Sequence, residues 1–464
     1  MENVKENKMG HAPLLGLITT MAVPAMFSMI IQALYNIVDS IFVSRYSEAG
    51  LTAVSLAYPL QMLIIAVGVG TGVGVNSLVS RKLGEKNFDE ANKAASHGLL
   101  LGFFNWLVFF ILGLTIVKPF INAFTDDPEI AKMGIDYLSV IMIYSFGCFI
   151  EIVIEKTLQA TGNMIFPMLF MISGAITNII LDPIFIFDSF MGIKCLGMGV
   201  KGAAVATVIG QILSMVFSLV VLFFKKHDVH ISFKNFKLSL NIIKNIYAVG
   251  IPAIVMQSIT SVMLVLVNSI LTKFSNSDIA ISVLNIYFKL QSFIFMPCFG
   301  LTQGLMPIMG YNYGARNKQR LTTALKYGCC IASVIMTLGT IIFLTIPNVL
   351  MGMFNANDEM LEIGCIALRV ICLCFIPAAI GIVFSSFYQA TGHGLRSMTI
   401  SMLRQLVILV PAAYLLSNIG LNAVWFAFPI AEAGALVLAI TFFINLYNKE
   451  IKYIDQPDKF NFKN

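Results

Sequence analysis

Long apolar segments recur along the whole chain, and they restrict its possible folds more than any other feature. Twelve of them have 20 residues or more. An α-helix crosses the ~30 Å hydrocarbon core of a bilayer with about 20 such residues. Charged residues make up only 12% of the chain, about half the share of a soluble domain. Because the segments are continuously apolar and do not alternate like barrel strands, the sequence predicts an all-α polytopic membrane protein.

Polar loops and tight turns separate the twelve predicted spans. The spans cover residues 14–44, 51–80, 94–118, 134–160, 166–188, 200–224, 242–273, 280–311, 322–347, 361–389, 398–417 and 421–447. The segments on the side of the amino terminus carry 21 of the 30 Lys and Arg residues, and the opposite loops carry six. Since Lys and Arg collect in cytoplasmic loops, both termini are expected in the cytoplasm. Anionic lipid next to these loops explains the net charge of +6, and no nucleic acid partner is expected.

The chain also contains an internal repeat. The sequence QATGN at 159–163 returns as QATGH at 389–393, and LGEKN at 83–87 returns as YGARN at 313–317. Both pairs are offset by 230 residues. A six-span unit has therefore been duplicated, and because six is even, both copies enter the membrane from the same side.

The repeat predicts two pseudo-symmetric six-helix bundles. The N-lobe covers residues 1–224, and the C-lobe with its cytoplasmic tail covers residues 245–464. Residues 225–244 form a basic cytoplasmic linker between them. In such parallel repeats a substrate site lies between or within the bundles, and the bundles rock to give alternating access.

An aspartate stands inside the first predicted span. Asp39 belongs to ALYNIVDSIFVSR at 33–45, where Tyr35 precedes it by four residues and so shares its helix face. A carboxylate at the centre of a spanning helix costs about 2.5–3.5 kcal/mol. The second copy has Val267 at the equivalent position. The duplicated architecture therefore does not need this acid, which favours a functional role for it.

The fifth predicted span shows the same asymmetry. Asn178 and Asp182 are four residues apart in TNIILDPIF, whereas the second copy reads VILVPAAYL at 407–415. Pro183 removes a backbone donor just after the acid, which can expose carbonyl groups to a polar cavity. Together with the first span, these residues predict a small-cation or proton site. The alternative is a polar cluster that only joins helices through hydrogen bonds.

Other intramembrane charges carry a weaker signal. Glu155 is expected to pair with its neighbour Lys156 in a structural role. Deep in the second half, a polar network is proposed for Lys289, Arg404 and Glu432, with Glu432 pairing with one of the two cations.

The sequence contains no motif for metal, nucleotide or covalent chemistry. H-E-x-x-H, C-x-x-C and a complete P-loop are all missing, and no nucleophile–base pair stands out. We therefore expect no resident metal, no cofactor and no enzyme activity. The glycines of GVGTGVGVN at 68–76 are interpreted as positions of close helix packing. Without an ATPase, transport energy would have to come from an ion gradient.

Four stretches of the sequence resemble one known family. VPA at 23–25 with LYNIVDSIFV, TNIILDPIFIF, GVKGAAVATVIGQ at 199–211 and the repeated QATG are similar to the multidrug and toxic compound extrusion (MATE) family over essentially the whole chain. The resemblance implies a twelve-helix antiporter of two lobes in a bacterial plasma membrane. It would export organic cations and other amphipathic compounds in exchange for H⁺ or Na⁺.

The resemblance also implies roles for individual residues. Those assigned to the cation or proton site are Asp39, Asn178, Asp182, Thr207 and the nearby Tyr35. With Na⁺ as the coupling ion, the first four would be its ligands. Pro24 corresponds to a proline linked to bending of the first helix. One departure is the segment DSFMGIKCLGMG at 188–199, which is several residues longer than expected and is predicted to lie outside the membrane.

The function predicted from the sequence is thus drug efflux by a monomer, with drug-like cations and membrane lipid as partners. The choice between H⁺ and Na⁺ stays open. A flippase for lipid-linked precursors is the first alternative, but it would favour a cationic cavity, whereas the first half supplies acids. A passive channel is the second alternative, and it would not need a duplicated, hinged bundle.

Overall fold

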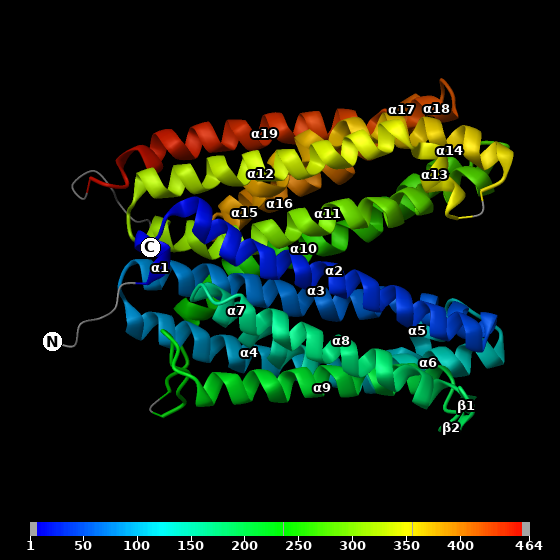
Figure 1. The fold of residues 1–464 in the computed structure, drawn as a ribbon, viewed down its shortest axis with the longest axis horizontal. Helices are drawn as coiled ribbons and strands as arrows, with labels where there is room; N and C mark the ends of the chain where they lie inside the picture. The colour runs from blue at the N-terminus through cyan, green and yellow to red at the C-terminus, as the bar shows by residue number, and fades with distance from the viewer. Residues whose placement is uncertain (1–6, 235, 355, 457–464) are drawn as a thin grey trace. The chain divides into compact units, whose positions relative to one another are not determined.

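The computed structural model describes residues 7–234, 236–354 and 356–456. Within these ranges the chain is almost entirely helical, with one small β-hairpin (Figure 1). Eleven helices are long and apolar enough to cross a membrane, and a bent pair raises the number to twelve. The predicted all-α polytopic fold is confirmed.

The elements of the first half are the following: α1 (Lys8–His11), α2 (Leu14–Tyr46), α3 (Glu48–Gly84), α4 (Phe88–Thr115), α5 (Val117–Asn122), α6 (Pro128–Ile143), α7 (Phe146–Ala160), α8 (Ile165–Ile186), β1 (Ser189–Phe190), β2 (Ile193–Lys194) and α9 (Val200–Phe224). Those of the second half are α10 (Leu240–Leu271), α11 (Ser277–Gly314), α12 (Lys318–Thr345), α13 (Pro347–Gly352), α14 (Asp358–Ile371), η1 (Cys372–Cys374), α15 (Phe375–Ala390), α16 (Gly394–Met402), η2 (Leu403–Ile408), α17 (Leu409–Leu416), α18 (Leu421–Val424), α19 (Ala427–Lys449) and η3 (Ile451–Tyr453).

The fourth predicted span, residues 134–160, is not one straight helix. It consists of α6 and α7, which meet at an angle of 45°. The helix ends where Ser145 donates its hydroxyl to the Met142 carbonyl at 2.8 Å. Directly after the bend, a Cβ on Gly147 would lie only 3.0 Å from the backbone of Gln211. The bend therefore lets α7 pack backbone to backbone against α9.

The two copies of the repeat adopt the same local structure. After α7, Gly162 takes a φ of +88°, and after α15, Gly392 takes a φ of +86°. In each case the following residue closes the helix end, with Asn163 N donating to Leu158 O at 3.1 Å and His393 N to Tyr388 O at 2.7 Å. A left-handed glycine of this kind ends helices without steric cost. The repeated QATG is thus a repeated helix terminus.

The LGEKN and YGARN pair is a repeated helix start. Asn87 accepts a hydrogen bond from Glu90 N at 3.2 Å, and Asn317 accepts one from Arg320 N at 3.0 Å. Each side chain caps the first turn of the next helix, α4 or α12. The residue before each asparagine is left-handed, with a φ of +59° at Lys86 and +56° at Arg316.

The chain divides into two compact units. Unit 1 comprises Met1–Met26, Ser80–Lys86 and Val255–Asn464, and unit 2 comprises Phe27–Val79 and Asn87–Ile254. Three helices, α2, α3 and α10, contribute to both units. In α2 and α10 the division comes two residues after an internal proline, Pro24 or Pro252. The lobe boundaries at 224 and 245 stay a prediction.

The core of unit 2 forms where α6 and α7 pack on α9. Tyr137 and Phe149 are almost completely buried there, and Ala203 and Ala204 give α9 a flat contact surface. Small residues let membrane helices approach closely. One side of α8, in contrast, carries large exposed apolar residues. Every fourth residue there is an isoleucine: Ile176, Ile180 and Ile184. In a membrane-spanning helix this stripe is the lipid-facing side.

The segment before α10 is fastened to the start of α4. Asn92 Oδ1 accepts from His230 N at 2.7 Å, and His97 Nε2 accepts from Ser239 N at 2.9 Å. The His97 ring is completely buried and lies 4.6 Å from that of Phe236, between centroids. The predicted linker is therefore a strap bound to unit 2, and its last five residues form the first turn of α10.

Candidate functional site

The site predicted in the first half is assembled from three helices of unit 2. Helix α2 carries Tyr35 and Asp39, α8 carries Asn178 and Asp182, and α9 carries Thr207. Helices α8 and α9 approach each other very closely, because glycines face each other where they cross. A Cβ on Gly210 would lie 2.9 Å from the carbonyl oxygen of Gly174. This close approach brings the next turn of α9 within reach of the polar residues of α8.

Asn178 joins the two helices. Its Nδ2 donates to Asp182 Oδ1 at 3.1 Å and to Thr207 Oγ1 at 3.2 Å. Both α8 residues are buried, with Asn178 3% and Asp182 0% exposed. The i, i+4 spacing inferred from the sequence thus corresponds to a real contact. Asn178 fixes the orientation of the Asp182 carboxylate through Oδ1. The other oxygen of this carboxylate, Oδ2, stays available to a further partner.

The carboxyl groups of Asp39 and Asp182 lie close enough to interact electrostatically. Tyr35, one turn before Asp39, interacts electrostatically with both acids. Two carboxylates held together in a buried place repel each other, and a proton or a cation shared between them removes this repulsion. The structure therefore brings together all five residues that the sequence grouped into this site.

Three oxygen atoms at the site are buried without a hydrogen-bond partner among the described residues. They are Asp39 Oδ1, Asn178 Oδ1 and Asp182 Oδ2. Buried polar atoms are usually paired, so an unpaired group of them calls for an explanation. Hard cations prefer oxygen ligands, and carboxylates also take up protons. Two acids, one amide oxygen and the Thr207 hydroxyl form a donor set that fits either ion.

Within the described residues, no group of three or more His, Cys, Asp or Glu side chains could hold a metal ion together. The site offers two acids and otherwise neutral oxygens, so one bound proton or Na⁺ would leave one negative charge on a fully ionised pair.

Two further residues of this site were not recognised in the sequence. Tyr137 of α6 is 2% exposed and interacts electrostatically with Asp39. Its hydroxyl donates to Gln61 Oε1 of α3 at 3.3 Å. A tyrosine and a glutamine in apolar spans give no signal of their own, because only the packing of α3 and α6 against α2 shows which face they occupy.

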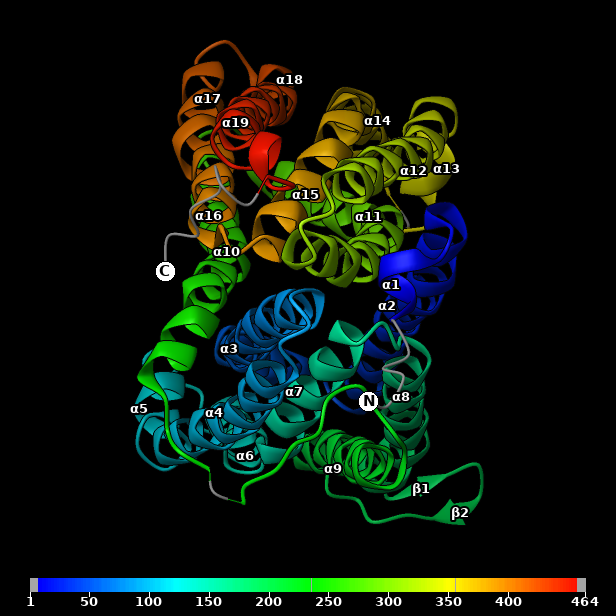
Figure 2. The ribbon, with the colours of Figure 1, turned by 90° about the vertical axis from the view of Figure 1, so that its left-hand side faces the viewer.

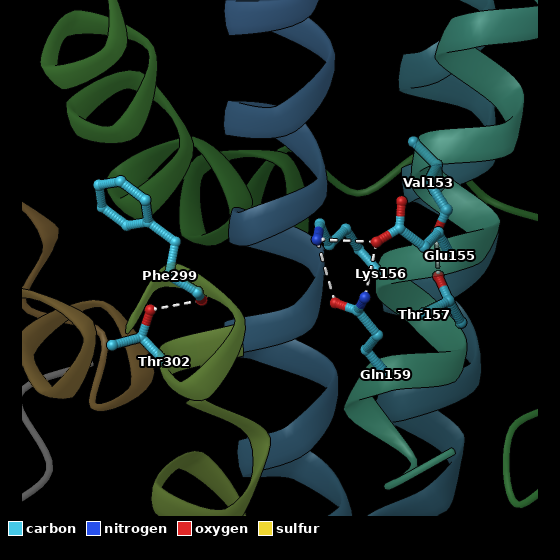
Figure 3. A network of polar contacts seen from close by, with 7 residues as sticks. All are labelled: Val153, Glu155, Lys156, Thr157, Gln159, Phe299 and Thr302. Atoms are coloured by element: carbon cyan, nitrogen blue, oxygen red, sulfur yellow. Dashed lines mark hydrogen bonds and ion pairs between the residues drawn. The ribbon is translucent and has the colours of Figure 1, made fainter. Parts of the chain in front are cut away.

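The pairing expected for Glu155 is found. Lys156 Nζ lies 3.0 Å from Glu155 Oε1, and the side chain of Gln159 contacts both, which closes a ring of three contacts on α7 (Figure 3). Every charge in this ring has a partner, so it stabilises the end of α7 and needs no ion. Glu151, one turn earlier, interacts with Ser214 of α9 and electrostatically with Tyr35.

The polar network proposed for the second half is only partly assembled. Arg404 Nη1 and Glu432 Oε1 lie 3.3 Å apart, with both side chains mostly buried. Arg404 is in η2, a π-helical segment, and such segments are frequent at functional sites. Lys289 Nζ lies 6.0 Å from the Phe354 ring centroid, and no ion pair with Glu432 is found for it among the described residues. The pairing expected for Glu432 with one of the two cations is therefore made with Arg404, and a role for Lys289 stays a prediction.

The sequence model of the MatE family matches the chain twice, over residues 24–184 and 252–415. The chain belongs to the MatE family. The first match contains Asp39, Asn178 and Asp182, and Thr207 lies between the two matches. As a member of a transporter family, this MATE protein is a multi-pass membrane transporter and not an enzyme.

Relatives agree over nearly the whole length. The multidrug export protein MepA of Staphylococcus haemolyticus is 26% identical over 430 residues, 92% of this chain and 93% of that protein. An outward-facing multidrug resistance MATE family transporter of the MOP superfamily superposes with a TM-score of 0.90 at 27% identity, over 98% of this chain and all of that one. A MOP superfamily transporter from Pyrococcus furiosus, described as having a binding pocket of reverse polarity, also gives 0.90, at 26% identity and with 98% and 100% coverage.

Proposed function

We propose that this MATE transporter exports organic cations and other amphipathic drug-like compounds in exchange for H⁺ or Na⁺. The names of the MepA and multidrug resistance relatives support the drug-efflux part of the proposal. The observation that carries the coupling part is the pair of the partly buried Asp39 and the fully buried Asp182, whose oxygens include two without a hydrogen-bond partner among the described residues. The copy of this site in the second half has Val267 and VILVPAAYL instead.

The proposed cycle uses the repulsion within this pair. With the site empty, the two carboxyl groups of unit 2 push α2 and α8 apart or hold a counter-ion between them. Binding of a proton to one carboxyl oxygen, or of Na⁺ between the unpaired oxygens, removes that repulsion and draws the two helices together. Helix α2 then repacks, with Pro24 as the point where it lacks one backbone hydrogen bond. The bound drug is released, and the ion leaves to the cytoplasm down its gradient.

The transporter would work in a bacterial plasma membrane with both termini in the cytoplasm. The distribution of Lys and Arg supports this orientation. We expect a monomer with no cofactor besides the coupling ion, because the site of unit 2 is complete within one chain.

A second candidate is a flippase for anionic lipid-linked precursors, prompted by the relative with a pocket of reverse polarity. The acids of unit 2 argue against an anionic headgroup at this place, since like charges repel. The two functions differ in the charge of the substrate, so a cationic dye and an anionic lipid probe distinguish them.

The test uses purified protein in vesicles loaded with a cationic fluorescent substrate. A pH gradient and a Na⁺ gradient are imposed separately. Asp39→Asn and Asp182→Asn should abolish gradient-driven export, whereas Asp126→Asn, at an exposed loop aspartate, should leave it unchanged. Wild-type-like export by Asp39→Asn, driven by either ion, would refute the coupling role. Transport in the absence of any gradient would support a channel instead.

A further inference from the structure

The residues between α8 and α9 fold into a β-hairpin with an unusual tip. Ser189 pairs with Lys194 and Phe190 with Ile193, which leaves Met191 and Gly192 as the two turn residues. Both have positive φ, +51° and +83°. This is the hairpin turn that strongly prefers Asn or Gly, since larger residues are strained there. Met191 is nevertheless placed at the first position, and 88% of it is exposed.

Further large apolar residues follow the tip. Ile193 is 70% exposed and Leu196 is 60% exposed, and the exposed Lys194 lies between them. A loop in water would normally present polar residues, and contiguous exposed apolar groups mark an interaction surface. A strained methionine at the most exposed point indicates that the apolar side chain itself is needed there.

The hairpin is held rigidly on unit 2. The Phe190 ring stacks on that of Phe187 at 5.8 Å and meets Phe42 edge-on at 6.1 Å, between centroids. The returning strand bonds to the end of α8, with Leu196 N donating to Ile184 O at 2.9 Å and Gly199 N to Ile186 O at 3.0 Å. These bonds satisfy carbonyls that the helix end would leave unpaired. The apolar tip is therefore fixed in direction and cannot fold back onto the bundle.

The hairpin tip continues the lipid-facing surface of α8. Ile176, Ile180 and Ile184 form the exposed stripe of α8, and the bond from Leu196 places another exposed apolar side chain just beyond its end. Viewed along the helices, β1 and β2 project sideways beyond α8 and α9 (Figure 2). The hairpin thus lies beside the helix ends and does not cover them. At the end of a spanning helix, this sideways space is occupied by lipid headgroups.

We propose that the hairpin of residues 188–199 is a membrane-surface anchor. Its tip inserts into the boundary between headgroups and acyl chains, in the leaflet on the opposite side from the strap that joins α9 to α10. Apolar residues of interfacial elements reach about 5–10 Å into this layer. Lys194 extends its apolar stem along the same layer and keeps its ammonium group at the lipid phosphates. The anchor does not depend on which ion or drug is transported.

The consequence for transport is mechanical. The hairpin fixes the outer end of α8 at one depth, and α8 carries Asn178 and Asp182 one to two turns further in. A pinned α8 gives the moving α2 a fixed partner, so loss of the anchor should reduce the transport rate more than substrate affinity.

The test places a reporter at the tip. Met191→Trp is purified and reconstituted in phosphatidylcholine vesicles with and without brominated acyl chains, and the emission of wild type is subtracted to remove Trp106 and Trp425. Bromines near the headgroup end should quench the added tryptophan more than bromines near the chain end. Asp126→Trp, in an exposed loop between α5 and α6, serves as the control and should be quenched less.

Two other readings predict different outcomes, and both would overturn the proposal. If the tip contacted a protein partner, the tryptophan of the purified protein would stay in water and would not respond to bromine. If it were a lid, its emission would change with added substrate and not with lipid. Should Met191→Trp fail to fold, Ile193→Trp provides the same readout on the neighbouring strand. Met191→Asn, which suits the turn better, should fold and should lower the transport rate several-fold with little change in half-saturating substrate concentration.

Discussion

The hydrogen bonds of Asn178 allow a quantitative prediction. Asn178→Leu keeps the size of the side chain but removes both donors at the contact between α8 and α9. A hydrogen bond to a charged partner contributes about 1.5–3 kcal/mol and one to a neutral partner about 0.5–1.5 kcal/mol. Asn178 makes one of each kind, at 3.1 Å to Asp182 and 3.2 Å to Thr207. We therefore expect the substitution to lower the free energy of unfolding by about 2–4.5 kcal/mol.

A double-mutant cycle with Thr207→Val separates the two bonds. The single change at Thr207 should cost about 0.5–1.5 kcal/mol, because only the neutral bond is lost. In the double variant this cost should largely disappear, since the donor is already gone, and the coupling energy should equal the cost of that bond. Thermal and denaturant unfolding in detergent measure all four proteins. Strict additivity, or an Asn178→Leu variant as stable as wild type, would refute the described geometry.

Three further predictions concern other positions of the chain. Gly74→Ala would place a Cβ 2.1 Å from a backbone carbonyl oxygen of α10, so it should destabilise unit 2 by about 3 kcal/mol in thermal unfolding. Gly381→Ala is the control: with open space around its Cβ, it should be neutral or stabilising. His97→Phe removes the acceptor for the Ser239 N–H of the strap and should raise the rate of amide hydrogen exchange there about twofold to tenfold. An unchanged exchange rate would contradict this hydrogen bond. Glu432→Gln leaves the buried Arg404 charge without its partner and should cost about 3–5 kcal/mol, and replacing both residues by apolar ones should restore most of the loss.

The sequence was most informative where a physical requirement acts on consecutive residues. The length of the apolar segments predicted the spans, because a bilayer must be crossed within one stretch of chain. The duplicated motifs predicted two copies of one unit, and the structure shows that Gly162 and Gly392 share the same left-handed conformation. Asp39 was singled out by comparison with Val267, a contrast between two copies of one fold that needs no other sequence.

The sequence was less informative where the rotation of one helix against another decides the outcome. Tyr137 and Gln61 join the candidate site only because α6 and α3 turn those faces toward α2, and many other polar residues in spans have the same local pattern. Lys289 was grouped with Glu432 because both lie deep in their predicted spans. Depth along a span does not show which way a side chain points around the helix. The bend between α6 and α7 depends on the contact of Gly147 with α9, which lies more than 60 residues away along the chain.

The positions of the two internal prolines have a consequence for the cost of motion. Helices α2 and α10 each pass from one compact unit to the other two residues after a proline, Pro24 or Pro252. Each proline leaves one carbonyl of the preceding turn without its usual donor, so bending there breaks one bond fewer than bending elsewhere in the helix. The duplication has therefore supplied a matched pair of weak points, one in each copy, and flexing at Pro24 spares the later part of α2 that carries Tyr35 and Asp39.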